Sequence, residues 1–278
     1  MRLTSPSGRS LRWVANVLLV LIGVAFLLPM LWLVFASFDA NATLSASLPS
    51  SLTLENFQKV LTPDLALIPL WNSVLLSGGS SLVTVAAAVL AAYPLSRYRS
   101  RFNKPFLYGV LFGTGLPITA MMVPVYSLFV SLNLIDSLPG TLFFMAASQL
   151  PMAIWMMKNF VDSVPVSLEE AAWTEGASSM RSLWAIVVPL MRPGIAVVFI
   201  FVFVQAWGNF FVPFILLLSS SKDPASVSIF TFFGQYGAVA YGQLAAYSLV
   251  YALPVLVLYV VVSRVLGGAS ALAGAVKG

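Results

Sequence analysis

Two adjacent carboxylates, Glu169 and Glu170, are the residues of this chain that come nearest to an acid–base pair. Neighbouring positions on a helix point in different directions, so these two groups make a poor acid–base pair. The chain has no cysteine and no histidine, which excludes disulfides, thiolate nucleophiles, cysteine or histidine zinc sites and histidine-ligated haem. No G-x4-G-K-[ST] phosphate loop occurs either. We therefore expect no catalytic residue, no metal site and no cofactor bound by this chain.

The polar segment around these carboxylates predicts two short helices joined by a glycine turn. Ser167 is placed to cap the first helix, with Glu170 three positions later, which is the spacing of a capping box. Ala171 and Ala172 then give this helix a smooth face. Gly176 follows at the position where a helix-ending residue adopts the left-handed conformation at little steric cost.

The second arm of this hairpin is expected to be a helix over residues 180–188. Ser178 or Ser179 is placed to cap it, and Pro189 follows it. Small residues let the surface of a partner approach closely, and a rigid helix transmits displacement to the segments that it connects. The hairpin therefore suits contact with a partner protein, although an amphipathic hairpin lying on a membrane would have the same pattern.

The composition around the hairpin is that of a membrane protein. Of the 278 residues, 60% are hydrophobic and 8% are charged, with a mean hydropathy of +0.96, whereas soluble domains carry roughly 25% charged residues. Charge-free runs cover residues 13–38, 65–96, 105–135, 137–157, 193–221 and 224–263. Each is long enough to cross a hydrocarbon core of ~30 Å as a helix of about 20 residues.

These runs predict an all-α protein with one domain over residues 1–278 and six transmembrane helices. The expected spans are about 13–38, 68–96, 105–131, 137–157, 193–218 and 241–263. The first apolar run exceeds the roughly 7–15 residues of a signal-peptide core, so we expect a retained span. Strand-length alternation typical of a membrane β-barrel is absent from the sequence.

The basic residues give the orientation. With the N-terminus inside, four segments are cytoplasmic: 1–12, 97–104, 158–192 and 264–278. They hold all of the 14 basic residues except Lys59 and Lys222. Cytoplasmic loops carry such an excess of lysine and arginine, so both termini are expected to be cytoplasmic. The same asymmetry accounts for the net charge of +5 without a nucleic-acid partner.

Residues 170–189 have the form E-A-A-x3-G-x9-I-x-[LV]-P, which resembles the cytoplasmic docking loop of binding-protein-dependent ABC importers. Four other segments extend the resemblance over nearly the whole chain: Asn72-Ser73, residues 91–97, residues 207–210 and residues 273–278. The chain resembles the inner-membrane permease subunit of the carbohydrate-uptake (maltose-type) branch of these importers. It departs from the pattern at Val188, where leucine is usual, and in the spacing of Trp207 and Asn209.

The resemblance implies the type I ABC importer permease fold in a bacterial or archaeal cytoplasmic membrane. It also implies four companions in the lipid bilayer and on its two sides: a second homologous permease, two nucleotide-binding subunits that hydrolyse ATP with Mg²⁺, and an extracytoplasmic solute-binding protein. The cytoplasmic loop 158–192 would dock into the nucleotide-binding subunits. The residues implied in coupling are Glu170, Ala171, Ala172, Gly176, Ile186 and Pro189.

Polar and aromatic side chains at membrane depth mark a candidate substrate path through Asn72, Gln205, Trp207 and Asn209. Amides and aromatic faces suit neutral, hydroxyl-rich solutes such as sugars, but amides equally often bind neighbouring helices. The function expected is therefore a sugar importer's permease. The alternatives are an importer for a polyamine or an anion, an intramembrane enzyme, or a self-sufficient channel.

Overall fold

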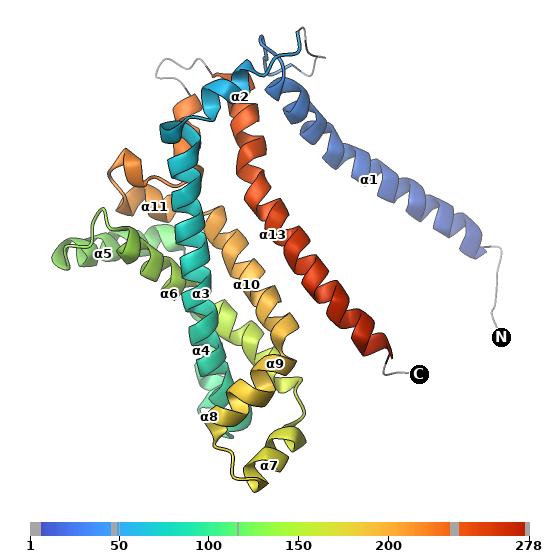
Figure 1. Cartoon of the computed structure of the whole chain (residues 1–278), viewed down its shortest axis with the longest axis vertical. Helices are drawn as coiled ribbons and strands as arrows, with labels where there is room; N and C mark the ends of the chain where they lie inside the picture. Colours follow the sequence, from blue (N-terminus) through green and yellow to red (C-terminus); the bar gives the residue numbers. More distant parts are fainter. Residues whose placement is uncertain (1–6, 46–48, 50, 116, 234–238, 276–278) are drawn as a thin grey trace. The chain divides into compact units, whose positions relative to one another are not determined.

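The computed structural model describes residues 7–45, 49, 51–115, 117–233 and 239–275. They form the helices of Figure 1, with turns and two isolated β-bridges. The prediction of an all-helical chain is confirmed for these residues. The chain divides into two compact units, the first formed by Met1–Thr62 with Ile229–Ala252 and the second by Pro63–Ser228 with Leu253–Gly278. Each unit is described by itself.

Four helices in the described part of the chain are long and apolar enough to cross a membrane. They are Trp13–Ser37, Pro63–Arg97, Leu138–Asp162 and Tyr241–Arg264. Two further pairs pass the same test together but bend sharply, Asn103–Gly113 with Ile118–Ser131 by 92° and Ser179–Leu190 with Arg192–Trp207 by 79°. The count rises to six if each bent pair is one span. Six spans and two cytoplasmic termini therefore stay predictions.

Two expected spans are interrupted. Residues 105–131 contain α4 (Asn103–Gly113) and α5 (Ile118–Ser131), and Pro117 directly precedes α5 with an extended backbone. Residues 193–218 contain α10 (Arg192–Trp207) and α11 (Phe211–Leu216). Asn209 Oδ1 accepts a hydrogen bond of 3.1 Å from Val212 N, which satisfies an amide at the start of α11 and favours a new helix there.

The first unit contains α1 (Ser7–Ser37), α2 (Glu55–Val60), η4 (Ile229–Phe232) and the start of α13 (Tyr241–Ala275). Buried Asn56 joins α2 to the end of α1, because its Nδ2 donates to Ser37 O at 3.1 Å and to Asp39 O at 2.9 Å. Gly242 lies so close to Asn56 that an added Cβ would clash with the amide. The most apolar window of α1 has no buried residue, so lipid or a partner has to cover this helix.

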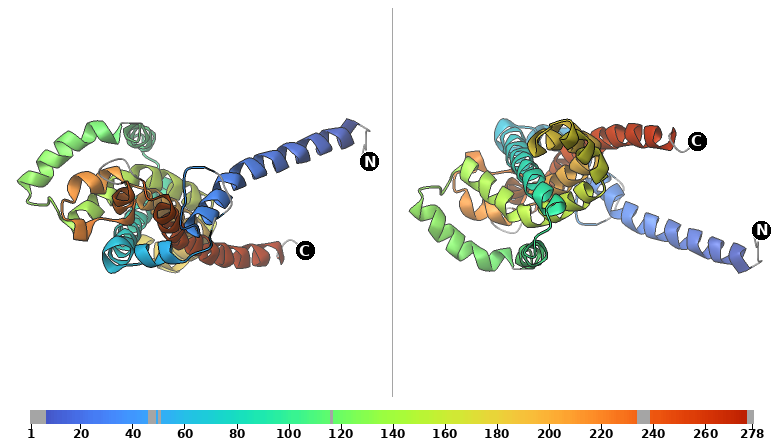
Figure 2. Two further views of the ribbon diagram at one scale, coloured as in Figure 1. Left: turned by 90° about the horizontal axis from the view of Figure 1, so that it is seen from above. Right: turned by 90° about the horizontal axis from the view of Figure 1, so that it is seen from below.

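The core of the second unit is α3 (Ile68–Arg97) packed on α6 (Leu138–Asp162) and α10. Figure 2 views the three helices along the vertical direction of Figure 1. A row of small hydroxyl side chains on α3 is buried, and Thr84 Oγ1 donates to Ala146 O of α6 at 3.1 Å. Small residues let helix backbones approach closely in a membrane, which explains this packing without long apolar side chains.

In the same unit, Asp136, between α5 and α6, binds the segment that follows α11. Its Oδ1 accepts from the amides of Leu218 and Ser219, both at 3.0 Å, and its Oδ2 accepts from Ser219 Oγ at 2.6 Å and from Lys222 Nζ at 2.7 Å. The same segment continues through η3 (Ser220–Lys222) into α12 (Ala225–Ser228). One carboxylate thus organises the turn between α5 and α6 and the chain after α11.

The ammonium group of Lys222 holds the pKa of Asp136 well below its ordinary value, and the Ser219 and Leu218 hydrogen bonds act in the same direction. A carboxyl with a lowered pKa in the folded state stabilises the fold above its unfolded pKa, about 3.9, and this stabilisation is lost as the pH falls through the lowered value. We expect Asp136→Asn to lower the melting temperature at pH 7, and the difference from wild type to shrink below about pH 4. Thermal unfolding in detergent across this pH range measures it.

The control is Lys59→Met, which removes the partner of Glu55 in an exposed ion pair. Exposed pairs of this kind contribute little, so the control should melt near the wild-type temperature at every pH. If the melting temperature of Asp136→Asn stays below that of the wild type by the same amount down to pH 2, the ionised Asp136 carboxylate does not stabilise the fold as predicted.

Candidate functional site

The first arm of the hairpin is α7 (Val166–Thr174). Its N-cap is Pro165, whose backbone is extended (φ −59°, ψ 125°), and no side chain caps the helix. The predicted capping box of Ser167 and Glu170 is therefore wrong. Proline places the helix start one residue ahead of Ser167, which puts Ser167 inside the first turn, where its hydroxyl has no cap position to occupy.

The glycine turn forms as predicted. Gly176 has φ +85°, Gly176 N donates to Trp173 O at 3.0 Å, and Ala177 N donates to Ala172 O at 2.9 Å. These two bonds are those of a Schellman motif, which closes a helix through a left-handed residue. Ser178 then caps α8 (Ser179–Ser182) by accepting from Arg181 N at 3.3 Å, as predicted.

The second arm runs from α8 through η2 (Leu183–Val187) to α9 (Val188–Leu190), and α10 follows after Met191. η2 is a π-helical turn inside this arm, and such turns are frequent at functional sites. The hairpin therefore joins the end of α6 to the start of α10 by two short arms.

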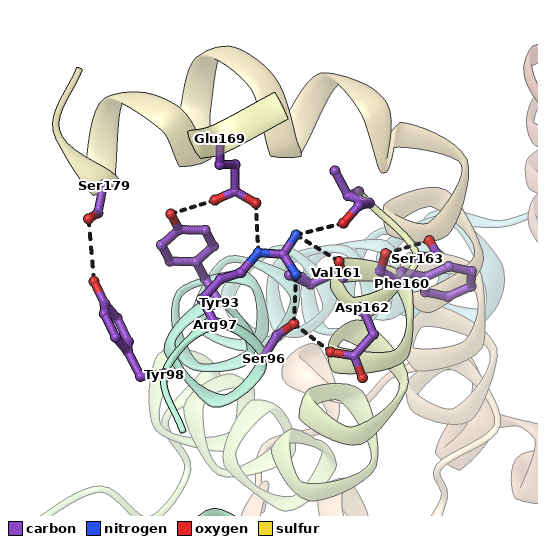
Figure 3. Close-up of polar contacts among 11 residues, drawn as sticks. Tyr93, Ser96, Arg97, Tyr98, Phe160, Val161, Asp162, Ser163, Glu169 and Ser179 are labelled. Atoms are coloured by element: carbon purple, nitrogen blue, oxygen red, sulfur yellow. Dashed lines mark hydrogen bonds and ion pairs between the residues drawn. The ribbon is translucent and has the colours of Figure 1, made fainter. Parts of the chain in front are cut away.

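Glu169 is completely buried within the hairpin, with a side chain 0% exposed. Its Oε1 accepts from Arg97 Nε at 2.6 Å and its Oε2 accepts from Tyr93 OH at 2.7 Å (Figure 3). Tyr93 and Arg97 stand one helical turn apart on α3, so both reach the same carboxylate. Sequence reasoning passed over Glu169 because it weighed this group only against its neighbour Glu170.

Arg97 extends the contact to the end of α6. The side chain is 5% exposed, and its Nη2 donates to Val161 O at 3.1 Å and to Val164 O at 3.0 Å. Its Nη1 donates to Ser96 Oγ at 3.1 Å, and Ser96 Oγ donates to Asp162 Oδ1 at 2.5 Å. Every side of the guanidinium thus has a partner, which a buried charge requires. The ends of α3, α6 and α7 meet in one network (Figure 3).

The residues implied in coupling lie mostly on the outside of this hairpin. Glu170, Ala171 and Gly176 are exposed, and Ala172 is half-buried. On the second arm Ile186 and Pro189 are half-buried. The two adjacent glutamates thus face opposite ways, Glu169 into the protein and Glu170 into the surroundings. Glu170 and the alanines form a small surface on α7 that a partner can reach.

The four residues of the candidate substrate path do not lie together. Gln205 and Asn209 line a cavity of about 710 Å³ in the second unit. Asn72 is buried and its Nδ2 donates to Ser221 O at 3.0 Å and to Asp223 O at 3.1 Å, while Trp207 is buried and stacks on Phe203 at 5.6 Å. Asn72 thus binds a neighbouring segment, which is a common role of buried amides, whereas Trp207 stacks on a ring of its own helix, α10.

The cavity lies among α4, α5, α6 and α10, and its volume is typical of a small-molecule site. The residues that line it besides Gln205 and Asn209 are Gly113, Thr114, Ile118, Met121, Phe144, Ala147, Ser148, Gln149, Pro151, Met152 and Phe201. No described residue hydrogen-bonds the Gln205 side chain, whereas Gln149 Nε2 donates to Val202 O at 3.4 Å. Among the described lining residues none is charged.

Comparison with known proteins gives the family. Residues 84–267 match the family model described as "Binding-protein-dependent transport system inner membrane component". The chain is 30% identical to the sulfoquinovosyl glycerol transport system permease protein SmoH of Agrobacterium fabrum, covering 98% of this chain and 95% of that protein. It is 29% identical to the glucose import system permease protein GlcU of Saccharolobus solfataricus, covering 94% of each. It is 28% identical to the trehalose transport system permease protein SugB of Mycobacterium tuberculosis, covering 91% and 93%.

Among solved structures, a chain of a bacterial ABC transporter involved in the import of the acidic polysaccharide alginate has the same fold. The TM-score is 0.81 at 22% identity, covering 95% of this chain and 99% of that chain. The predicted type I ABC importer permease fold is thereby confirmed, and the rival reading as an intramembrane enzyme is set aside because these relatives are transport permeases. The chain belongs to the binding-protein-dependent transport system inner membrane component family.

Proposed function

We propose that this chain is the permease subunit of an ATP-driven, binding-protein-dependent sugar importer and forms half of its translocation pathway. The relatives at 28–30% identity are named for transport of glucose, trehalose or sulfoquinovosyl glycerol, which supports a sugar as the solute. The observation that carries the coupling role is the hairpin, whose E-A-A surface is exposed while Glu169 anchors it to α3. The companions are a second homologous permease, two ATPase subunits and an extracytoplasmic binding protein.

The coupling surface in this proposal consists of Glu170, Ala171 and Ala172 on α7, the turn at Gly176, and the second arm with Ile186 and Pro189. Alanine side chains permit close approach of a partner's backbone, and Glu170 adds an exposed charge for pairing. The Schellman turn sets the angle between the two arms, so the surface has a defined shape before the ATPase subunits bind.

The cavity supports a neutral solute better than a charged one. Gln149, Gln205 and Asn209 supply amides, and Phe144 and Phe201 supply aromatic faces. An anion or a polyamine held within the membrane would require a compensating charge, and the described lining residues supply none. We therefore place part of the sugar path along this cavity.

Uptake by a reconstituted complex tests the function. The chain is purified with its companions, placed in proteoliposomes, and offered radiolabelled glucose, trehalose and sulfoquinovosyl glycerol, with spermidine and glucuronate as charged solutes. We expect ATP-dependent uptake of a sugar. Uptake of only a charged solute would reject the substrate class, and uptake by this chain without ATPase subunits would reject the coupled mechanism.

Gln205→Leu tests the path. Because no described residue hydrogen-bonds this amide, its loss should spare the fold while weakening sugar transport about two- to tenfold, as for one hydrogen bond. Uptake at several sugar concentrations measures the effect, and basal ATP hydrolysis should stay unchanged. Val204→Ala is the control, since Val204 is exposed on the same helix and does not line the cavity. Equal transport by Gln205→Leu and wild type would remove Gln205 from the path.

A further inference from the structure

Glu169 and Glu170 are neighbours with opposite surroundings, and only Glu170 belongs to the E-A-A surface. We infer that Glu169, Arg97 and Tyr93 form a positioning clamp that makes α7 move as one body with the ends of α3 and α6. This inference rests on the proposed function, because the clamp has a task only if a partner displaces α7. In that case Glu169 transmits the displacement and Glu170 receives it.

The clamp spans the junction at which α7 would otherwise pivot. α6 ends at Asp162 and α7 begins at Val166, so only three residues connect them. Arg97 binds a carbonyl on each side of the α6 end, that of Val161 in the helix and that of Val164 in the connection. Through its Nε it also binds Glu169, one turn into α7. One guanidinium from α3 thus fixes the angle between α6 and α7.

The geometry of the clamp is stiff because each bond comes from a different direction. Both oxygens of Glu169 are used, one by Arg97 and one by Tyr93, and the planar guanidinium holds its acceptors in a rigid fork. Water does not compete, since both charged side chains are almost completely buried. An apolar cluster of the same volume would be at least as stable, but it would not define the direction of α7 in this way.

The clamp also connects the hairpin to the cavity. α6 carries Phe144, Gln149 and Met152 among the lining residues, and α10, which carries Gln205, continues from the second arm of the hairpin. A displaced α7 therefore reaches the cavity along two helices, through the backbone into α10 and through Arg97 into α3 and α6. Without the clamp, the first arm would be joined to α6 by the three-residue connection, and to the second arm by the turn at Gly176 and by its contacts with α8 and η2.

Two tyrosines at the end of α3 give a matched pair of variants. Tyr93→Phe removes one hydroxyl from the buried carboxylate, whereas Tyr98→Phe removes an exposed hydroxyl that donates to Ser179 Oγ at 3.3 Å. Glu169→Gln is the stronger variant, because it leaves Arg97 without a counter-charge. None of the three changes a residue of the E-A-A surface, so the ATPase subunits should still assemble with each variant.

The decisive measurement is a distance. The chain has no cysteine, so Asn159→Cys on α6 and Thr174→Cys on α7, both exposed positions, carry the only spin labels. In the reconstituted complex we expect one narrow distance between them, equal without nucleotide and after trapping with ATP and vanadate. Tyr98→Phe should keep it, Tyr93→Phe should broaden it after trapping, and Glu169→Gln should broaden it in both states.

The functional counterpart is the number of solute molecules imported per ATP hydrolysed. We expect this ratio to fall about tenfold in Glu169→Gln and about threefold in Tyr93→Phe, and to stay unchanged in Tyr98→Phe. The reason is that hydrogen bonds to a charged group, such as those of Glu169, are stronger than the neutral bond of Tyr98. A narrow distance and a normal ratio in Glu169→Gln and Tyr93→Phe would overturn the clamp. The clamp would also be overturned if each variant lost assembly with the ATPase subunits in proportion to its lost uptake. The residues would then be needed only for folding or assembly.

Failure of the proposed function has a different signature. A wild-type complex that imports no sugar would reject that function, but the label distance with ATP and vanadate would still decide whether α7 and α6 move as one body.

Discussion

Replacing Arg97 with methionine is expected to lower the free energy of unfolding by about 3–5 kcal/mol, the usual cost of removing one partner of a buried ion pair. The substitution leaves Glu169 as an unpaired buried carboxylate, and it removes the donor for the carbonyls of Val161 and Val164. Thermal or denaturant unfolding of the purified chain in detergent measures the loss. Among the single substitutions considered, this one should destabilise the chain most.

The double variant Arg97→Met with Glu169→Leu separates the two sources of that cost. It removes the uncompensated charge and fills much of the same volume, so it should recover at least half of the stability lost in the single variant. Arg97→Lys is the conservative comparison, and we expect it to recover little, because one ammonium cannot reproduce the fork that reaches both α6 carbonyls and Glu169. A double variant no more stable than Arg97→Met would show that the charge itself is not the cause.

The membrane character of the chain and the hairpin turn were both predictable from the sequence for physical reasons. A charge-free run of sufficient length has few stable environments other than a membrane. A glycine after a run of helix formers most often ends the helix in the left-handed conformation. Both signals act over a few residues. Gly176 therefore has the left-handed conformation that the sequence indicates, and Ser178 caps the helix that follows.

The main omission, the role of Glu169, arises where distant residues decide the outcome. The contact between Arg97 and Glu169 joins positions 72 residues apart, and no local periodicity reports it. A signal for it was nevertheless present, because Tyr93 and Arg97 stand four residues apart at the polar end of an apolar helix. Two such donors on one helical face require an acceptor when the face is buried.

The interruption of the fifth expected span has a local cause instead. Residues 193–218 contain no charge, so hydropathy alone predicts one continuous helix. Gly208 ends α10, and the Asn209 carboxamide then supplies the first hydrogen bond of α11. Asn209 was predicted to be part of a substrate path, and in the structure it both lines the cavity and accepts a hydrogen bond at the start of a helix.

Gly176→Val is expected to leave membrane insertion intact while weakening association with the ATPase subunits about tenfold or more. No atom lies within 4 Å of a Cβ added at Gly176, so crowding by neighbours contributes nothing to the effect. The cost is that of holding an L-residue in the left-handed region at φ +85°, about 1–2 kcal/mol, and it is larger for a β-branched side chain. The strained turn should open the Schellman motif and change the angle between the arms. Co-purification of the ATPase subunits at graded salt measures the association.

Gly176→Asn distinguishes backbone strain from the loss of glycine itself. Asparagine visits the left-handed conformation readily, so this variant should retain most of the association, with Gly176→Ala between the two. Association should therefore decrease from asparagine to alanine to valine. This order follows the backbone preference of the residues and not their volume, because asparagine is larger than alanine. Normal co-purification and uptake in Gly176→Val would mean that the angle between the arms has no part in coupling. Equal losses in all three variants would instead mean that the partner requires the bare backbone of glycine.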